Sequence, residues 1–430
     1  MSFWDFSNIL RLLSEFATVL LSWGWLFIVF FALWIAWEVY LRLKQIDYVS
    51  AIHFTYLQIT VPEETPQTPK AMEQAFEVWG GIHKNPDLLE RYFEGYMLAW
   101  YTCELECTRN RVRFIMVVPT VHRKFFEGVI YGQYPTAEIR EVEDYAQAFP
   151  HRDLEKTFDL YGTEMVLVRE DIFPIRTYHD YEDALAEDER YIDPLQALIE
   201  AFTTIEEGEH FWFQLLVRPV SASDINTWSE RGQEEINRIA GRVKEKPPGV
   251  TARLFEFLTA LPGELFQAAT KGPLEASAKN DIKPQRLFMT PPEQDITKAI
   301  LQKVGRSGFR TKMRVVHIAP VGKLHKPNAS KAIGVFKQFN TSHLNSLKPD
   351  DATKTNGPNY ILKQTRRRYR KRVILLNYQF RDFWGDKSGS MMTAEELATL
   401  FHFPSKYGRS PSIQRATSGL GSAPENLPYI

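Results

Sequence analysis

Cysteine is almost absent from this sequence of 430 residues. Cys103 and Cys107 are the only two, which is too few for a disulfide framework and compatible with a reducing compartment. On one strand they would lie about 13 Å apart, too far to form a disulfide bond. No second pair of Cys or His residues has the spacing of zinc ligands, so we expect no metal and no cofactor.

The common sequence motifs of catalysis are missing too. There is no phosphate-binding loop of the Walker type, no nucleophile elbow, no H-E-x-x-H and no paired C-x-x-C. The glycine-containing segment Lys303–Gly308 lacks both the required lysine and a preceding strand. We therefore predict no catalytic residue. An enzyme of unknown chemistry stays an alternative, because a catalytic site is assembled in space.

The charges nearly cancel, with a formal net charge of −1, so composition alone does not indicate a nucleic-acid partner. They are segregated, however. Residues 178–193 are rich in Asp and Glu, whereas residues 366–372 read RRRYRKR. Local fields of this kind matter more than the sum.

One long stretch, Ala17–Trp37, has no charged residue. As a helix it would span roughly 30 Å, the thickness of a bilayer interior. We therefore predict a tail over residues 1–16 and a transmembrane helix over residues 17–40. Arg42 and Lys44 follow it, which favours a short outside N-terminus and a cytoplasmic C-terminal region. The expected membrane-anchoring residues are Trp23, Trp25, Phe27, Leu33, Trp34 and Trp37.

Residues 50–170 are predicted to form a first α+β unit. Period-two alternation predicts a strand over Phe54–Val61, and Thr68-Pro69 begins a helix. A hairpin, a second helix and a further strand follow, up to Val142. The order β-α-β-β-α-β is that of the ferredoxin-like split arrangement, so we expect an α+β fold.

Residues 190–385 are predicted to form a second α+β unit of related topology, split by a helical insertion at about residues 244–285. Its last strand is expected over Val373–Phe380. No residue-level repeat supports a duplication. Residues 391–430 are predicted to form a short helix and a flexible tail rich in Ser, Gly and Pro.

The basic run is expected on an extended segment, where alternation would direct some of its charges to solvent. One interpretation is an anionic partner, either DNA or a membrane surface, with an aromatic ring of the run stacking on a base. The other is a solvated edge strand whose charges prevent edge-to-edge pairing. The residues are Arg366, Arg367, Arg368, Tyr369, Arg370, Lys371 and Arg372.

The phrase MMTAEELATLFHFP, Met391–Pro404, resembles the segment before the motor domain in bacterial conjugation and type IV secretion ATPases of the HerA/FtsK and TraG/TraD kind. Residues 411–413 and 423–428 extend the resemblance. Leu57–Phe76 is similar to the opening of their N-terminal non-motor region, a membrane-anchored domain family of unknown function. Those proteins continue into a Walker-type ATPase, which has no counterpart here, so ATP hydrolysis is not carried over.

The resemblance implies a non-catalytic scaffold in the bacterial inner membrane. Such a scaffold would position a separately encoded HerA/FtsK-like ATPase in a system that translocates DNA or protein. The implied partners are the bilayer, this ATPase, DNA and further copies of the chain. A membrane-tethered nucleic-acid-binding module that uses the basic run is the alternative. Docking of the motor is expected through Leu397, Leu400, Phe401 and Phe403.

Overall fold

The computed structural model describes residues 6–404, apart from 63–64, 83, 85, 182–192, 243–288, 325, 357–361 and 385–388. The predicted insertion at residues 244–285 and the tail beyond Pro404 therefore lie outside the described residues. The strands are β1 (Phe54–Thr60), β2 (Tyr101–Thr108), β3 (Arg111–Pro119), β4 (Glu138–Glu141), β5 (Phe158–Leu167), β6 (His210–Pro219), β7 (Gly308–Pro320), β8 (Leu347–Pro349) and β9 (Ser390–Thr393).

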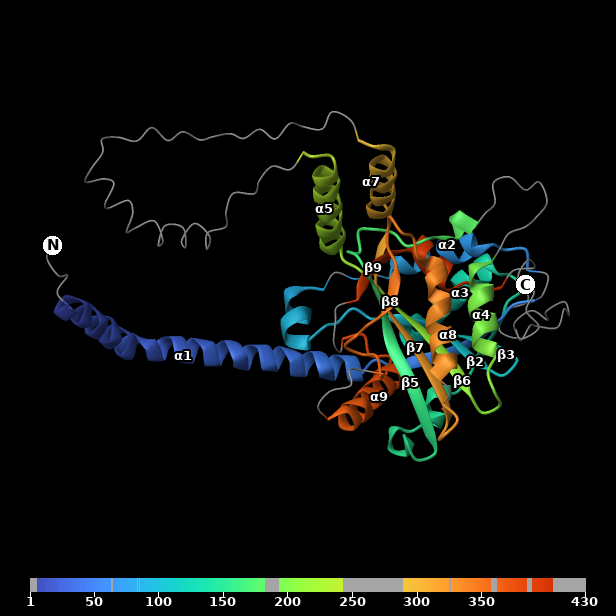
Figure 1. The fold of residues 1–430 in the computed structure, drawn as a ribbon, viewed down its shortest axis with the longest axis horizontal. Helices are drawn as coiled ribbons and strands as arrows, with labels where there is room; N and C mark the ends of the chain where they lie inside the picture. The colour runs from blue at the N-terminus through green and yellow to red at the C-terminus, as the bar shows by residue number, and fades with distance from the viewer. Residues whose placement is uncertain are drawn as a thin grey trace, which may run out of the picture.

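Helices connect and cover these strands (Figure 1). The α-helices are α1 (Phe6–Ser50), α2 (Pro69–Gly80), α3 (Arg123–Gln133), α4 (Pro194–Thr203), α5 (Ala222–Ile239), α7 (Pro291–Val304), α8 (Lys326–Val335), α9 (Lys363–Gln379) and α10 (Ala394–Leu400). Shorter helical turns are η1 (Glu90–Glu94), η2 (Thr120–His122), η3 (Tyr145–Ala148), η4 (His151–Asp153), η5 (Tyr178–Tyr181) and η6 (Phe336–Phe339).

The nine strands form one antiparallel sheet in the order β4-β1-β3-β2-β6-β7-β5-β8, and β9 pairs with β7. The first four strands, with α2 and α3 between them, have the order of a split βαβ unit. The chain is therefore α+β, as the periodicity predicts. Alternate burial along β1, at Leu57 and Ile59, places one face of this strand in the core.

The second half repeats this order. Read from the far edge, it is β8-β5-β7-β6, with α4 between β5 and β6 and α8 between β7 and β8. The two halves meet where β2 pairs with β6, from Tyr101 opposite Val217 to Cys107 opposite Phe211. The two predicted units thus share a single sheet. Strand β5 belongs to the second unit by its pairing with β7, so that unit begins at Phe158, earlier than predicted.

The two faces of the sheet have separate cores. On β6, Phe213 and Leu215 face the large core that α2, α3, α4 and α10 cover. Trp212, which directly precedes Phe213, faces the opposite core, where Ile374 and Leu375 of α9 pack. Helix α9 is therefore the main cover of the second face (Figure 1).

The predicted transmembrane helix is corrected by the structure. Helix α1 is 45 residues long and continues through Arg42 and Lys44 to Ser50. Its last turns pack on the folded body, since the ring of Trp37 lies 6.4 Å from that of Tyr92. Within the part of the chain that the structure describes, no helix is both long and apolar enough to cross a membrane.

The expected anchor residues are distributed along this helix. Four of them have solvent-exposed side chains, namely Trp25, Leu33, Trp34 and Trp37. The side chains of Trp23 and Phe27 lie outside the described part of the chain.

The strand predicted over Val373–Phe380 is also wrong, because this segment belongs to helix α9. The buried positions Lys371, Ile374, Leu375 and Tyr378 follow helical spacing. Arg, Lys, Gln and Leu, which have high helix propensity, outweigh the few β-branched residues. The basic run is consequently helical, and it does not protect a sheet edge.

Candidate nucleic-acid interface

Helix α9 distributes the basic run over several environments. Its apolar side packs on the sheet, so Lys371 is buried, where it pairs with Glu155 at 3.1 Å and with Asp159. Arg370 is half-buried and donates a hydrogen bond to the carbonyl of Lys354 at 2.9 Å. These two cations hold the helix in place, so they have little freedom to bind a ligand.

The remaining residues of the run have more contact with solvent. Arg367 is half-buried, and the others are exposed, namely Arg366, Arg368, Tyr369 and Arg372. The Tyr369 side chain is 68% exposed, so its ring is accessible for stacking. The run therefore presents a mixed basic and aromatic surface on the outer side of α9.

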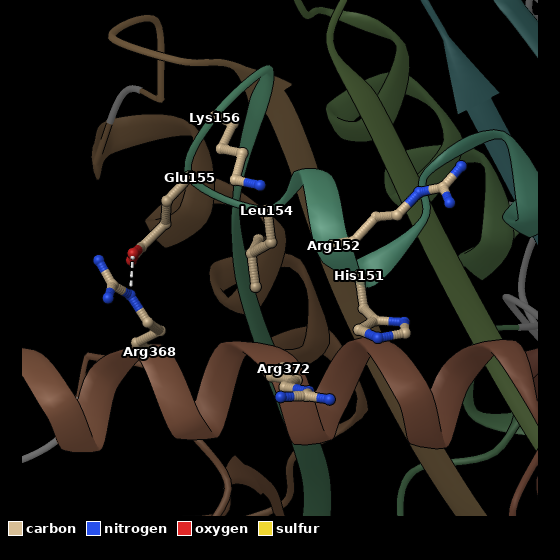
Figure 2. A pocket seen from close by; sticks show the side chains of 7 residues that line it. All are labelled: His151, Arg152, Leu154, Glu155, Lys156, Arg368 and Arg372. Atoms are coloured by element: carbon tan, nitrogen blue, oxygen red, sulfur yellow. Dashed lines mark hydrogen bonds and ion pairs between the residues drawn. The ribbon is translucent and has the colours of Figure 1, made fainter.

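Two of these arginines line a pocket against a distant segment of the chain (Figure 2). Arg368 and Arg372 are one helical turn apart and face the turn that contains η4. The pocket has a volume of about 490 Å³. Its walls are His151, Arg152, Leu154, Glu155, Lys156, Arg368 and Arg372.

Local backbone geometry brings this turn to the helix. Glu155 has a left-handed backbone (φ 64°), and its amide donates to the carbonyl of Phe158 at 2.7 Å. The resulting turn directs the Glu155 carboxylate toward α9. At the C-terminal end of α9, the side-chain amide of Gln379 donates hydrogen bonds to the backbone carbonyls of Ala146 and Phe149, at 2.8 and 2.9 Å. The middle and the C-terminal end of α9 are thereby held against the 145–156 segment.

The pocket carries excess positive charge. Its single carboxylate, Glu155, accepts hydrogen bonds from Arg368 at 2.6 Å and from Lys371 at 3.1 Å. Burial raises the pKa of Glu155, but these two cations outweigh burial and lower it. Arg152, Lys156 and Arg372 make no ion pair with any carboxylate in the described part of the chain. An anion with several negative oxygens fits this arrangement.

Sequence reasoning identified only the half of this site on α9. The segment His151–Lys156 was missed because Lys371 and Glu155 are 216 residues apart in the chain. Its one visible signal is the charge-rich sequence HRDLEK, which matches neither a strand nor a helix period. The described residues contain no cluster of three or more His, Cys, Asp or Glu side chains that could hold a metal ion.

The predicted docking residues lie in the core. Leu397, Leu400, Phe401 and Phe403 are at most 1% exposed. Phe401 and Phe403 both stack edge-on against Phe114 of β3, at centroid distances of 5.9 and 5.7 Å. This burial is incompatible with the predicted docking role, because these side chains have no surface to offer a partner.

Comparison with known proteins identifies the family of this chain. No curated protein matches this sequence. The model of a family described as a domain of unknown function, DUF8128, matches residues 66–416, from just before α2 to beyond α10. The match carries no link to the secretion ATPases that the C-terminal phrase resembles. Because the match extends over most of the sequence, this chain belongs to the DUF8128 family of domains of unknown function.

Proposed function

We propose that this chain is a non-catalytic nucleic-acid-binding module. The observation that carries the proposal is the pocket between α9 and the η4 turn, where Arg152, Lys156 and Arg372 have no carboxylate partner among the described residues. Phosphate contacts supply most of the affinity in such interfaces, and arginine binds phosphate through two parallel hydrogen bonds.

The surface beside the pocket favours a polymer over a single small anion. Arg366 and Tyr369 are exposed on the same helix as Arg368 and Arg372. A nucleic acid presents successive phosphates along its backbone, together with bases that stack on aromatic rings. A row of exposed cations with an exposed tyrosine matches both features.

The test is DNA binding by the full chain as a function of salt. In the variant R368Q/R372Q, we expect weaker binding and a salt dependence reduced by about 0.9 for each phosphate that the variant no longer binds. The matched control is R109Q/R140Q, because both side chains are exposed, with Arg109 in the turn between β2 and β3 and Arg140 on the edge strand β4. It removes the same charge and should retain the wild-type salt slope.

The outcomes separate the proposal from its competitors. Equal binding by R368Q/R372Q and R109Q/R140Q would show that only general charge matters, and would contradict the proposed site. Binding to vesicles of anionic lipid with no binding to DNA would assign the pocket to phospholipid headgroups instead.

A scaffold for a separately encoded translocation ATPase is the second candidate. It is supported by the resemblance of Met391–Pro404, which the structure folds into β9 and α10. The burial of this phrase means that a motor would have to contact other surfaces. Co-purification of full-length protein, and of protein ending at Pro404, with an ATPase encoded by a neighbouring gene tests this candidate. No recovery by either would contradict it.

A further inference from the structure

A second group of cations lies beyond the C-terminal end of α9, on the same face of the sheet. Arg218 lies at the last position but one of β6, opposite Arg310 of β7, and Lys312 of β7 lies opposite Leu216. The Arg218 guanidinium lies 4.3 Å from the ring centroid of Trp384 and 5.0 Å from that of Phe383. Lys312 lies 5.7 Å from the Phe383 ring. Two cations thus contact one aromatic pair, and Arg310 lies beside Arg218 on the neighbouring strand.

Arg218 is half-buried, and its partners differ from those of two fully buried cations of this protein. Arg314 has Glu164 at 2.9 Å, and Lys303 has Glu396 at 2.9 Å. Arg218 has no such carboxylate among the described residues, and its buried Nε atom has no hydrogen-bond partner there. A half-buried guanidinium whose Nε atom is shielded from water and has no partner is unfavourable unless an anion completes its hydrogen bonds.

Two carboxylates lie near this group, and neither forms an ion pair with Arg218: Asp171 lies 3.8 Å from Arg310, which also donates a hydrogen bond to the carbonyl of Gly389 at 3.3 Å. Asp171 accepts a hydrogen bond from the amide of Met391 at 3.0 Å, and it lies 3.2 Å from Arg231. Asp224 forms the capping box of α5 with Ser221. Burial and the neighbouring charge of Arg310 lower the pKa of Arg218 to about 10, an effect that Asp224 only partly offsets.

The aromatic rings beside these cations indicate that the ligand carries a planar ring as well as an anionic group. A guanidinium stacked on an indole keeps its N–H edge available for phosphate. Trp384 is 38% exposed, so part of its ring remains accessible to a nucleobase. We propose that Arg218, Arg310 and Trp384 form a nucleotide-binding site, in which a phosphate lies against the guanidinium groups and a base stacks on the indole.

This site does not depend on the pocket at the other end of α9. The same chemistry is supplied by a free nucleotide or by one nucleotide of a single strand. The experiment therefore titrates the full chain with adenosine monophosphate and, separately, with a labelled oligothymidine. The variants are R218Q and W384L, and the matched control is R140Q at the exposed edge strand β4.

We expect W384L and R218Q each to bind at least one of the two probes about tenfold more weakly than wild type, whereas R140Q is unchanged. W384L is informative even where R218Q fails to fold, because Trp384 is at the surface. Weaker binding of adenosine monophosphate assigns a free nucleotide, and weaker binding of oligothymidine alone assigns a strand.

Equal affinity of wild type and W384L for both probes would overturn the site, as would the absence of binding to either. The variant R368Q/R372Q distinguishes this failure from that of the proposed function. One result is that this double variant loses oligothymidine binding while W384L and R218Q bind both probes like wild type. That result would support the pocket on α9 and contradict the nucleotide site. The reverse pattern leaves the nucleotide site as the supported one.

Discussion

His402 Nε2 lies 2.8 Å from the Asp193 carboxylate, in the interior of the protein. Asp193 also caps α4, because its side chain accepts a hydrogen bond from the amide of Leu195. The other ring nitrogen of His402 lies 2.7 Å from the carbonyl of Ala398 at the end of α10. One contact therefore joins the C-terminal segment to the first crossover helix of the second half.

This pair predicts loss of stability in acid. Burial raises the pKa of Asp193, but the charge and hydrogen bond of His402 outweigh burial, so the folded pKa is lowered. The ionised Asp193 carboxylate therefore stabilises the folded state fully above its unfolded pKa of about 3.9. This stabilisation is lost as the pH falls through the lower folded pKa. Asn retains the helix cap without the charge. In urea unfolding, the stability difference between wild type and D193N should shrink between about pH 5 and pH 2; a constant difference would contradict the linkage.

A second prediction concerns the buried ion pair between α7 and α10. Lys303 Nζ lies 2.9 Å from Glu396, and both side chains are at most 2% exposed. Removal of one partner leaves the other charge buried, so K303M should lower the free energy of unfolding by about 3–5 kcal/mol. Adding E396Q should restore part of that loss. A double variant less stable than K303M by the full cost of E396Q alone would indicate that the two charges do not interact.

The strand periods of residues 54–142 were sufficient to predict the first split unit, because β1 alternates between buried and half-buried positions. The sequence did not indicate that the two halves share one sheet. The shared sheet depends on β2 pairing with β6, and both strands are buried along nearly their whole length, which gives no directional pattern.

Two failures at the candidate sites have physical causes. Apolar side chains at helical spacing, such as Leu397 and Leu400, look the same whether they face a partner or the core of their own chain. The Val373–Phe380 segment contains strand-forming residues, yet it folds as part of helix α9. In this form its apolar side chains cover one face of the sheet and become buried. Local sequence propensity indicates neither what an apolar helix face will contact nor which segment will cover the sheet.

The core role of α10 gives a third prediction. Leu400 is fully buried, so L400A should lower the free energy of unfolding by about 2–5 kcal/mol. L301A is the matched control, because Leu301 lies half-exposed on α7, and its effect should stay within about 0.5 kcal/mol. Chemical denaturation of both variants measures the difference. If L400A were as stable as L301A, the core role of α10 would be contradicted, and a role at the protein surface would be supported instead.

The last prediction concerns the contact between α1 and the folded body. Gly95 ends η1 in a left-handed conformation, with a φ of 69°. A Cβ atom there would lie 2.5 Å from the carbonyl carbon of Lys44 and 2.6 Å from its oxygen, which are backbone atoms that no rotamer change can move. G95A should therefore displace the end of α1 from η1 and separate the rings of Tyr48 and Tyr96, now 5.3 Å apart. Hydrogen exchange should accelerate in the last turns of α1 and remain slow in the central strands. The control is G128A on α3, where a Cβ meets nothing within 4 Å; unchanged protection of α1 in G95A would show that this contact does not hold the helix.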